Sequence, residues 1–176
     1  KELKAFKEVA GDSLVDLTLP GIGRDVLALR KISEATGVNV VAATGWYVVA
    51  SHPCLVKYKG VEELRKIMVQ ELVEGINETG IRAGIIGEIG CSSHLHPDEK
   101  KVLQAAAQAQ RETEACLFLH ITSWDDFEKI QIREGQMYLD IIEKEGGNIN
   151  KVVMGHMDSY NRDEIPLLGV DLDYHR

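Results

Sequence analysis

Three residues with metal-binding side chains each follow a short apolar run that has the character of a β-strand. These residues are Glu88, His120 and His156. The runs before them, in the same order, cover residues 83–87, 116–119 and 152–155. A carboxylate and two imidazoles are typical ligands of catalytic zinc, which makes hydroxide available at neutral pH. Because α/β barrels carry their chemistry at the C-terminal ends of their strands, we expect these side chains to converge on one metal ion.

The elements that must position these residues alternate along the whole chain. Apolar residues at helical spacing, such as Leu64, Ile67 and Met68, mark the helices, and short apolar runs mark the strands. The sequence predicts helices over residues 1–9, 25–36, 61–76, 97–113 and 136–145, strands over 13–17, 38–43, 83–87, 116–119 and 152–155, and a long connection over 44–60. Strands that alternate with helices of this length predict parallel β/α units.

Two architectures can hold about five parallel strands: a partial (β/α)8 barrel and a doubly wound sheet. The length of 176 residues suits the doubly wound sheet, because a complete barrel needs at least about 200 residues. However, residues 20–23 (Pro-Gly-Ile-Gly) lack the full glycine pattern of a dinucleotide-binding loop. Neighbouring strand ends of a barrel can also converge on one metal, whereas those of a flat sheet spread apart. We therefore predict a partial TIM barrel that forms a single, incomplete domain over residues 1–176.

Composition excludes several classes of partner. The formal net charge of −8 argues against a nucleic acid or an anionic membrane. No apolar run approaches the roughly twenty residues of a membrane span, and residues 1–7 are charged and amphipathic, unlike a signal peptide. Cys54, Cys91 and Cys116 are widely spaced and have neither zinc nor redox spacing. Free thiols suit a reducing compartment, so we expect a cytoplasmic protein.

Several motifs resemble, in the same order, the phosphotriesterase-related family of the amidohydrolase superfamily. They are residues 20–25 (PGIGRD), 43–47 (ATGWY), 80–90 (GIRAGIIGEIG), 119–120 (LH) and 155–158 (GHMD). Members of that family have a (β/α)8 barrel with a binuclear metal centre, usually zinc. They hydrolyse esters, lactones, phosphotriesters or related acyl bonds. The resemblance therefore implies a zinc-dependent hydrolase that uses a metal-activated hydroxide and acts on a small-molecule substrate.

The resemblance also implies roles for single residues. Glu88 would occupy the fourth-strand position of the ligand that bridges the two metals. His120 and His156 would be the fifth- and sixth-strand ligands of one metal. Tyr47, with Trp46 beside it, would line the substrate pocket after the third strand.

The chain departs from the family pattern at two places. The family's first strand supplies a His-x-His pair to the other metal, and its eighth strand supplies an Asp that binds metal and handles the proton. The chain resembles strands two to six and has no counterpart of either. We therefore expect an internal fragment that holds at most one zinc and has no hydrolase activity on its own. Its two open sheet edges predict self-association.

These residues also have alternative interpretations that do not involve catalysis. His94 and His96 have the His-x-His spacing, but they lie in a predicted loop, where this spacing does not guarantee that both side chains reach one metal; we favour exposed loop histidines over metal ligands. Glu88 could form a structural salt bridge, and a single histidine at a strand end is often a core residue. The rival function is a non-catalytic metal-binding or interaction module that keeps half of a barrel. A doubly wound nucleotide-binding protein is the third possibility.

Overall fold

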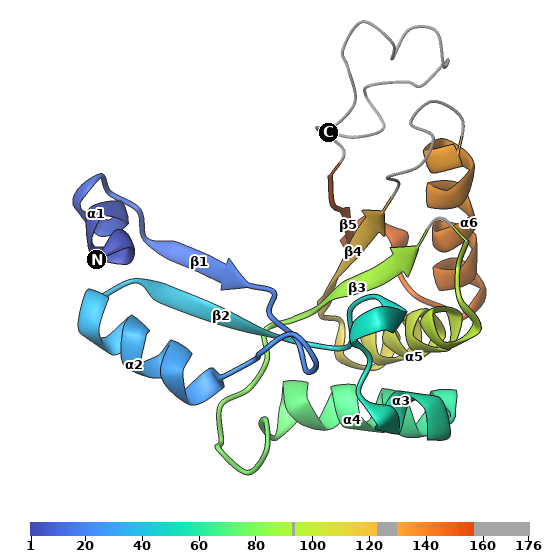
Figure 1. The fold of residues 1–176 in the computed structure, drawn as a ribbon, viewed down its shortest axis with the longest axis horizontal. Coiled ribbons are helices and arrows are strands. Elements are labelled where there is room, and N and C mark those ends of the chain that lie inside the picture. The colour runs from blue at the N-terminus through green and yellow to red at the C-terminus, as the bar shows by residue number, and fades with distance from the viewer. Residues whose placement is uncertain (93, 123–129, 157–176) are drawn as a thin grey trace, which may run out of the picture.

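The computed structural model describes residues 1–92, 94–122 and 130–156, in which strands and helices alternate (Figure 1). The helices are α1 (Glu2–Glu8), α2 (Val26–Thr36), α3 (Cys54–Tyr58), α4 (Val61–Val73), α5 (Pro97–Thr113) and α6 (Ile130–Lys144), with short 3-10 turns η1 (Val49–Ser51) and η2 (Ile149–Lys151). The strands are β1 (Ser13–Asp16), β2 (Asn39–Thr44), β3 (Ile85–Ser92), β4 (Cys116–Thr122) and β5 (Val152–Met154). Among these helices, none has the length and apolar character needed to span a membrane.

The five strands of the described residues form one parallel sheet in the order β1-β2-β3-β4-β5. Each strand therefore lies beside the next one in the sequence, with Leu14 opposite Val40 and Leu117 opposite Val152. A doubly wound sheet reverses its strand order at a switch point, and this sheet does not. Successive neighbours are the rule in a (β/α)8 barrel. The predicted partial barrel is confirmed, and the doubly wound alternative is wrong.

Local signals define the ends of two helices close to where the sequence predicts them. The side chain of Asp25 accepts a hydrogen bond of 3.0 Å from the backbone N–H of Ala28 at the start of α2. Gly37 ends this helix in the left-handed conformation, with φ of 70°. Pro97 begins α5, at a position where its missing N–H costs no helical hydrogen bond.

Other boundaries differ from the prediction. The connection over residues 44–60 contains η1 and α3, and α6 begins at Ile130 rather than at residue 136. The difference that matters most is in β3, which begins at Ile85 and continues to Ser92. Its last four residues pair with residues 119–122 of β4. Glu88 therefore lies inside the strand and not after its end.

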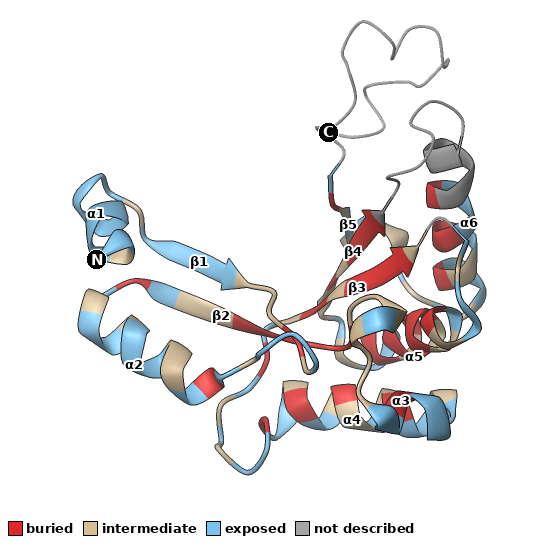
Figure 2. Ribbon diagram, viewed as in Figure 1, coloured by how far each residue is buried: buried red, intermediate tan, exposed pale blue. Residues whose placement is uncertain are grey.

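Two clusters of buried apolar side chains hold the layers together. The larger cluster joins β3 and β4 to α4, α5 and α6, and its members Leu64, Leu103, Leu117 and Tyr138 have no exposed surface. The smaller cluster consists of Val26, Ala42, Ile76 and Ala83. Figure 2 shows that buried residues concentrate in β3, β4 and α5, whereas α1 and β1 are almost entirely exposed. The packing is therefore strongest around the strands that carry the candidate ligands.

A buried ion pair links the loop after β1 to α4 and β2. Arg24 donates two hydrogen bonds, of 2.6 and 2.7 Å, to the carboxylate of Glu71 and a third, of 3.0 Å, to the carbonyl of Ala43. The hydroxyl of Thr44 donates to the same carboxylate at 2.6 Å. Removal of one partner from such a buried pair typically costs about 3–5 kcal/mol. The pair therefore constrains the end of β2, from which the chain continues to Trp46 and Tyr47.

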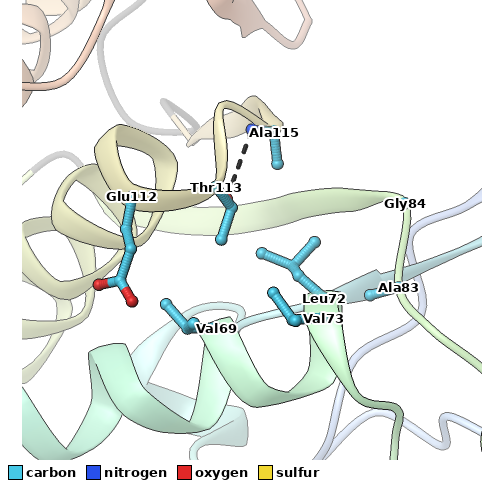
Figure 3. A pocket seen from close by; sticks show the side chains of 8 residues that line it. All are labelled: Val69, Leu72, Val73, Ala83, Gly84, Glu112, Thr113 and Ala115. Atoms are coloured by element: carbon cyan, nitrogen blue, oxygen red, sulfur yellow. Dashed lines mark hydrogen bonds between the residues drawn. The ribbon is translucent and has the colours of Figure 1, made fainter.

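A pocket lies between α4 and α5, at the end of the sheet where β3 and β4 begin (Figure 3). Its lining residues are Val69, Leu72, Val73, Ala83, Gly84, Glu112, Thr113 and Ala115. Most of these side chains are apolar, and Glu112 supplies the one carboxylate among them. Because barrels carry their chemistry at the opposite, C-terminal ends of their strands, we do not assign this pocket to the functional site.

Candidate metal centre

The side chains of Glu88, His120 and His156 come together in the structure. Nδ1 of His120 lies 3.3 Å from Oε2 of Glu88 and 3.0 Å from Nε2 of His156, and that Nε2 lies 3.7 Å from Oε1 of Glu88. One ligand atom from each residue lies within 4.8 Å of the other two. Within residues 1–92, 94–122 and 130–156, this is the one group of three or more His, Cys, Asp or Glu with such spacing. The expected convergence is found, and metal binding by these residues stays a prediction.

The position of Glu88 depends on an irregular stretch of β3. The register between β3 and β4 shifts between Ile86 and Ile89, and the Gly87–Glu88 peptide bond is cis. Gly87 has φ of +116°, and a Cβ at this residue would lie 2.2 Å from the carbonyl oxygen of Phe118. Only glycine therefore fits at residue 87. The Glu88 side chain that follows is 20% exposed and reaches the His120 ring.

Pairing between β4 and β5 delivers the two histidines to the same place. His120 lies within β4 and is 8% exposed, whereas His156 lies two residues beyond β5 and its side chain is 53% exposed. The backbone N–H of Gly155 donates a hydrogen bond of 2.8 Å to the carbonyl of Leu119, which extends the pairing to the residue before His156. The two imidazole rings meet edge to face, with centroids 4.6 Å apart.

The two aromatic residues predicted to line a substrate pocket have different surroundings. The hydroxyl of Tyr47 lies 2.8 Å from Nε2 of His120. Burial and then the charge of Glu88 raise the pKa of Tyr47 above its ordinary value of 10.0, so the phenol stays protonated at neutral pH. Trp46 is 2% exposed within the larger core cluster, and its indole N–H has no hydrogen-bond partner among the described residues. Tyr47 is therefore the better placed of the two to contact a ligand.

Two polar residues that contact the segment around Tyr47 are not among those that the sequence singles out. Glu99 is completely buried and accepts hydrogen bonds from the backbone N–H groups of Val49 and Ser92. Nε2 of His52 lies 2.8 Å from the carbonyl oxygen of Tyr47. A local signal for Glu99 exists, since a glutamate three residues after a helix N-cap is typical of a capping box. No local signal indicates its bonds to residues 49 and 92, which come from other segments.

The two loop histidines, His94 and His96, are not part of the candidate metal group. His94 and His96 are both exposed. Nδ1 of His96 accepts a hydrogen bond of 3.1 Å from the backbone N–H of Asp98 and so caps the start of α5. Neither histidine belongs to a group with metal-binding spacing in the part of the chain that the structure describes.

The donor set is chemically suited to a divalent metal. Two imidazole nitrogens and a carboxylate are ligands that zinc accepts readily, and three protein ligands are the usual number at a catalytic zinc. Without a metal, the same groups form an imidazole–carboxylate network of the kind that serves general acid–base chemistry. The chemistry of the donors therefore fits a metal site and does not by itself select the metal.

The chain is similar to known proteins along nearly its whole length. A model of the phosphotriesterase family matches residues 1–171. N-acetyltaurine hydrolase from Xenopus tropicalis is 40% identical over 170 residues, which cover 96% of this chain and 46% of the relative. The crystal structure of a resiniferatoxin-binding protein from Rhodobacter sphaeroides matches with a TM-score of 0.82 and 39% identity, over 89% of this chain and 42% of the other.

A second solved structure shows a similar match. It is a phosphotriesterase homology protein from Escherichia coli, solved with phosphate in its active site. Its TM-score is 0.80 at 30% identity, and the match covers 94% of this chain and 55% of that protein. The chain spans about half the length of the curated relatives that it matches.

The burial of His52 predicts a pH dependence of stability. Burial lowers the pKa of His52 below its ordinary value of 6.5, against smaller opposing effects of the Tyr47 carbonyl and the carboxylates of Glu99 and Asp98. The folded protein therefore binds a proton at His52 less readily than the unfolded chain does. The stability linked to neutral His52 is present above pH 6.5 and is lost as pH falls through that value toward the lower pKa of the folded state.

Urea unfolding of the 176-residue chain and of a His52→Gln variant, each between pH 5 and pH 8, measures this linkage. We expect the free energy of unfolding of the unmodified chain to fall more steeply below pH 6.5 than that of the variant. Glutamine keeps an N–H donor for the Tyr47 carbonyl and does not titrate. Parallel curves for the two proteins would contradict the lowered pKa.

Proposed function

Because the chain belongs to the phosphotriesterase family, we propose that it forms one incomplete barrel domain of a metal-dependent hydrolase. The convergence of Glu88, His120 and His156 is the observation that carries this proposal. These residues lie on β3, β4 and just after β5, at the positions that the family resemblance assigns to the fourth, fifth and sixth strands. A carboxylate and two imidazoles that meet beside a parallel sheet are the ligands expected from these three strands of a barrel metal site.

We propose zinc as the metal, held by Glu88, His120 and His156. A bound zinc ion supplies a Lewis acid and lowers the pKa of water toward 7. The chain contributes the ligand geometry. Nδ1 of His120 faces the Glu88 carboxylate, whereas its Nε2 faces the Tyr47 hydroxyl. The Tyr47 hydroxyl also lies 3.4 Å from Nδ1, so its shorter contact is the one with Nε2, and the carboxylate and the hydroxyl together orient the ring.

Tyr47 and Trp46 serve the substrate side of the proposed site. The Tyr47 phenol stays protonated, because burial and Glu88 raise its pKa, so it can donate a hydrogen bond to a substrate oxygen. Trp46, the preceding residue, packs in the core and so anchors the segment. The substrate we propose is a small molecule with an ester, lactone, phosphotriester or related acyl bond. The name of the Xenopus tropicalis relative adds an N-acyl amide to this class.

The chain on its own should hold at most one zinc. Only one group of described residues has metal-binding spacing. The family resemblance assigns the ligands of a second metal to a first-strand His-x-His pair and an eighth-strand Asp, for which this sequence has no counterpart. The same Asp handles the proton in the family. We therefore propose that the 176-residue chain binds zinc without catalysing hydrolysis by itself. Three free cysteines support a reducing, cytoplasmic location.

A second candidate function is a non-catalytic metal-binding or interaction module. The observation that favours it is the sheet itself, because β1 pairs only with β2, and β5 only with β4, among the described strands. Such a sheet offers its edges to a partner. The two candidates differ in whether these residues support turnover once the rest of a family barrel is supplied.

A chimera separates the two functions. In it, this chain replaces the aligned segment of the Xenopus tropicalis relative, which supplies the rest of the barrel. With zinc added, we expect the chimera to hydrolyse N-acetyltaurine or one member of a panel of esters, lactones and amides. Glu88→Ala should lower this turnover by more than the roughly 10–100-fold that is typical of a ligand's hydrogen-bond partner. The turnover by the unfused chain should not exceed that by free zinc ion.

The matched control is Glu34→Ala, which removes an exposed glutamate of α2. It should leave turnover of the chimera unchanged. A folded, zinc-loaded chimera that has no turnover on any substrate would support the non-catalytic module. Equal turnover in the Glu88→Ala and unmodified chimeras would exclude Glu88 from the site.

The open edges of the sheet predict that the isolated chain self-associates. Val15 on β1 is 49% exposed and Val153 on β5 is 43% exposed, and edge strands with apolar side chains pair readily with other chains. Light scattering coupled to size-exclusion chromatography should therefore show species larger than a monomer. The double substitution Val15→Lys and Val153→Lys should shift the population toward monomer, because lysine protects edge strands.

Val73→Lys is the control, since Val73 is 57% exposed on α4, away from either edge strand. It should leave the association unchanged. A monomeric unmodified chain over the whole concentration range would contradict the prediction.

A further inference from the structure

Glu99 is a buried carboxylate to which the proposed function gives no role. It is 0% exposed and lies in the first turn of α5. A buried carboxylate is unfavourable unless hydrogen bonds replace its lost hydration. The structure provides those bonds, and the donors come from three separate segments of the chain.

Four donors surround the carboxylate of Glu99. The backbone N–H of Val49 donates at 2.9 Å, that of Ser92 at 3.1 Å and that of His96 at 3.2 Å. The hydroxyl of Ser92 donates at 2.8 Å. A capping box needs only the bond to the N-cap residue, which is His96 here. The other three bonds reach the segment after β2 and the last residue of β3. Glu99 therefore does more than cap the start of α5.

Those two segments carry residues of the candidate metal centre. Val49 lies two residues after Tyr47, and Ser92 lies four residues after Glu88. Between them the backbones touch, because a Cβ at Gly90 would lie 2.2 Å from the nitrogen of Val48. The carbonyl of Trp46 accepts a hydrogen bond of 3.4 Å from the N–H of Gly90. Glu99 therefore links the segment that carries Tyr47 to the strand that carries Glu88.

These contacts between the Tyr47 segment and β3 determine where the Tyr47 hydroxyl lies. That hydroxyl lies 2.8 Å from Nε2 of His120, the ring nitrogen that does not face Glu88. The partner of the second ring nitrogen orients a metal-binding histidine and affects its affinity for the metal. A shift of the Tyr47 backbone would remove that partner.

We propose that Glu99 is a positioning residue that locks the Tyr47 segment to β3, so that the Tyr47 hydroxyl holds the His120 ring in its metal-binding orientation. This inference rests on the proposed function for the role of His120 in metal binding. Its structural part, the dependence of the Tyr47–His120 hydrogen bond on Glu99, does not require a metal. The two parts can therefore be measured separately.

The first measurement is nitrogen NMR of the histidine side chains in the metal-free 176-residue chain. Tyr47→Phe removes the hydroxyl and defines the Nε2 shift of a His120 ring without this bond. Glu99→Gln should move the Nε2 shift of His120 in the same direction. Glu145→Gln is the matched control, because Glu145 also accepts two hydrogen bonds from α5, from Gln104 and Gln108, and it contacts no residue of the site through them. It should leave His120 unchanged.

A second variant tests the specific link, in case Glu99→Gln does not fold. Val49 is the first residue of η1, where proline is tolerated, and Val48 before it is extended, with φ of −71° and ψ of 154°. Val49→Pro therefore deletes the N–H that donates to Glu99 and leaves the other three bonds in place. It should reproduce the His120 shift, whereas Val49→Ala, which keeps the N–H, should not.

The second measurement is zinc affinity, by competition with a chromophoric chelator. Glu99→Gln, Val49→Pro and Tyr47→Phe should each weaken zinc binding about tenfold, as is typical for partners of a metal ligand. In the Tyr47→Phe background, Glu99→Gln should weaken zinc binding little further, because both changes remove the same hydrogen bond between Tyr47 and His120. Unchanged His120 shifts in folded Glu99→Gln and Val49→Pro would overturn the inference and leave Glu99 as a helix cap. An unmodified chain that binds no zinc would overturn the proposed metal site, while the His120 shifts would still decide the role of Glu99.

Discussion

Parallel pairing of β3, β4 and β5 is the constraint on which the candidate site depends. Neighbouring parallel strands run in the same direction, so residues near their C-terminal ends lie side by side. The register places His120 opposite Gly90, two residues after Glu88, and the bond from Gly155 to Leu119 brings His156 beside His120. The strand pairing therefore brings the three ligand atoms together. Any change that shifts one strand by two residues would separate the donors.

Buried polar contacts extend this order to the segment that carries Tyr47. The Arg24–Glu71 pair holds the end of β2 against α4, and Glu99 holds the turn after Tyr47 against the end of β3. Both glutamates are buried and have several donors each. Buried charges of this kind are costly unless every partner is in place. They consequently specify one arrangement of the loops, which apolar packing alone would define less strictly.

The sequence predicts most of the fold and the three candidate ligands, because these depend on local patterns. Asp25, Gly37 and Pro97 define helix ends by their own chemistry, and apolar runs identify the strands before His120 and His156.

The prediction fails where distant residues decide the structure. β3 continues past Glu88 because residues 89–92 find partners on β4. Glu99 follows the local pattern of an ordinary helix start, yet it is buried and accepts hydrogen bonds from Val49 and Ser92. Trp46 is buried in the larger core cluster, and no local pattern indicates this.

Anomalous X-ray diffraction at the zinc edge, from crystals of the chain grown with zinc, tests the central claim most directly. The account predicts one strong peak per chain, with Glu88, His120 and His156 donating an oxygen and two nitrogens at about 2.0–2.2 Å. The same crystals of a Glu88→Gln, His120→Asn double variant should lack that peak. A zinc peak at His94 and His96, or none at the three-residue cluster at saturating zinc, would contradict the proposed metal centre.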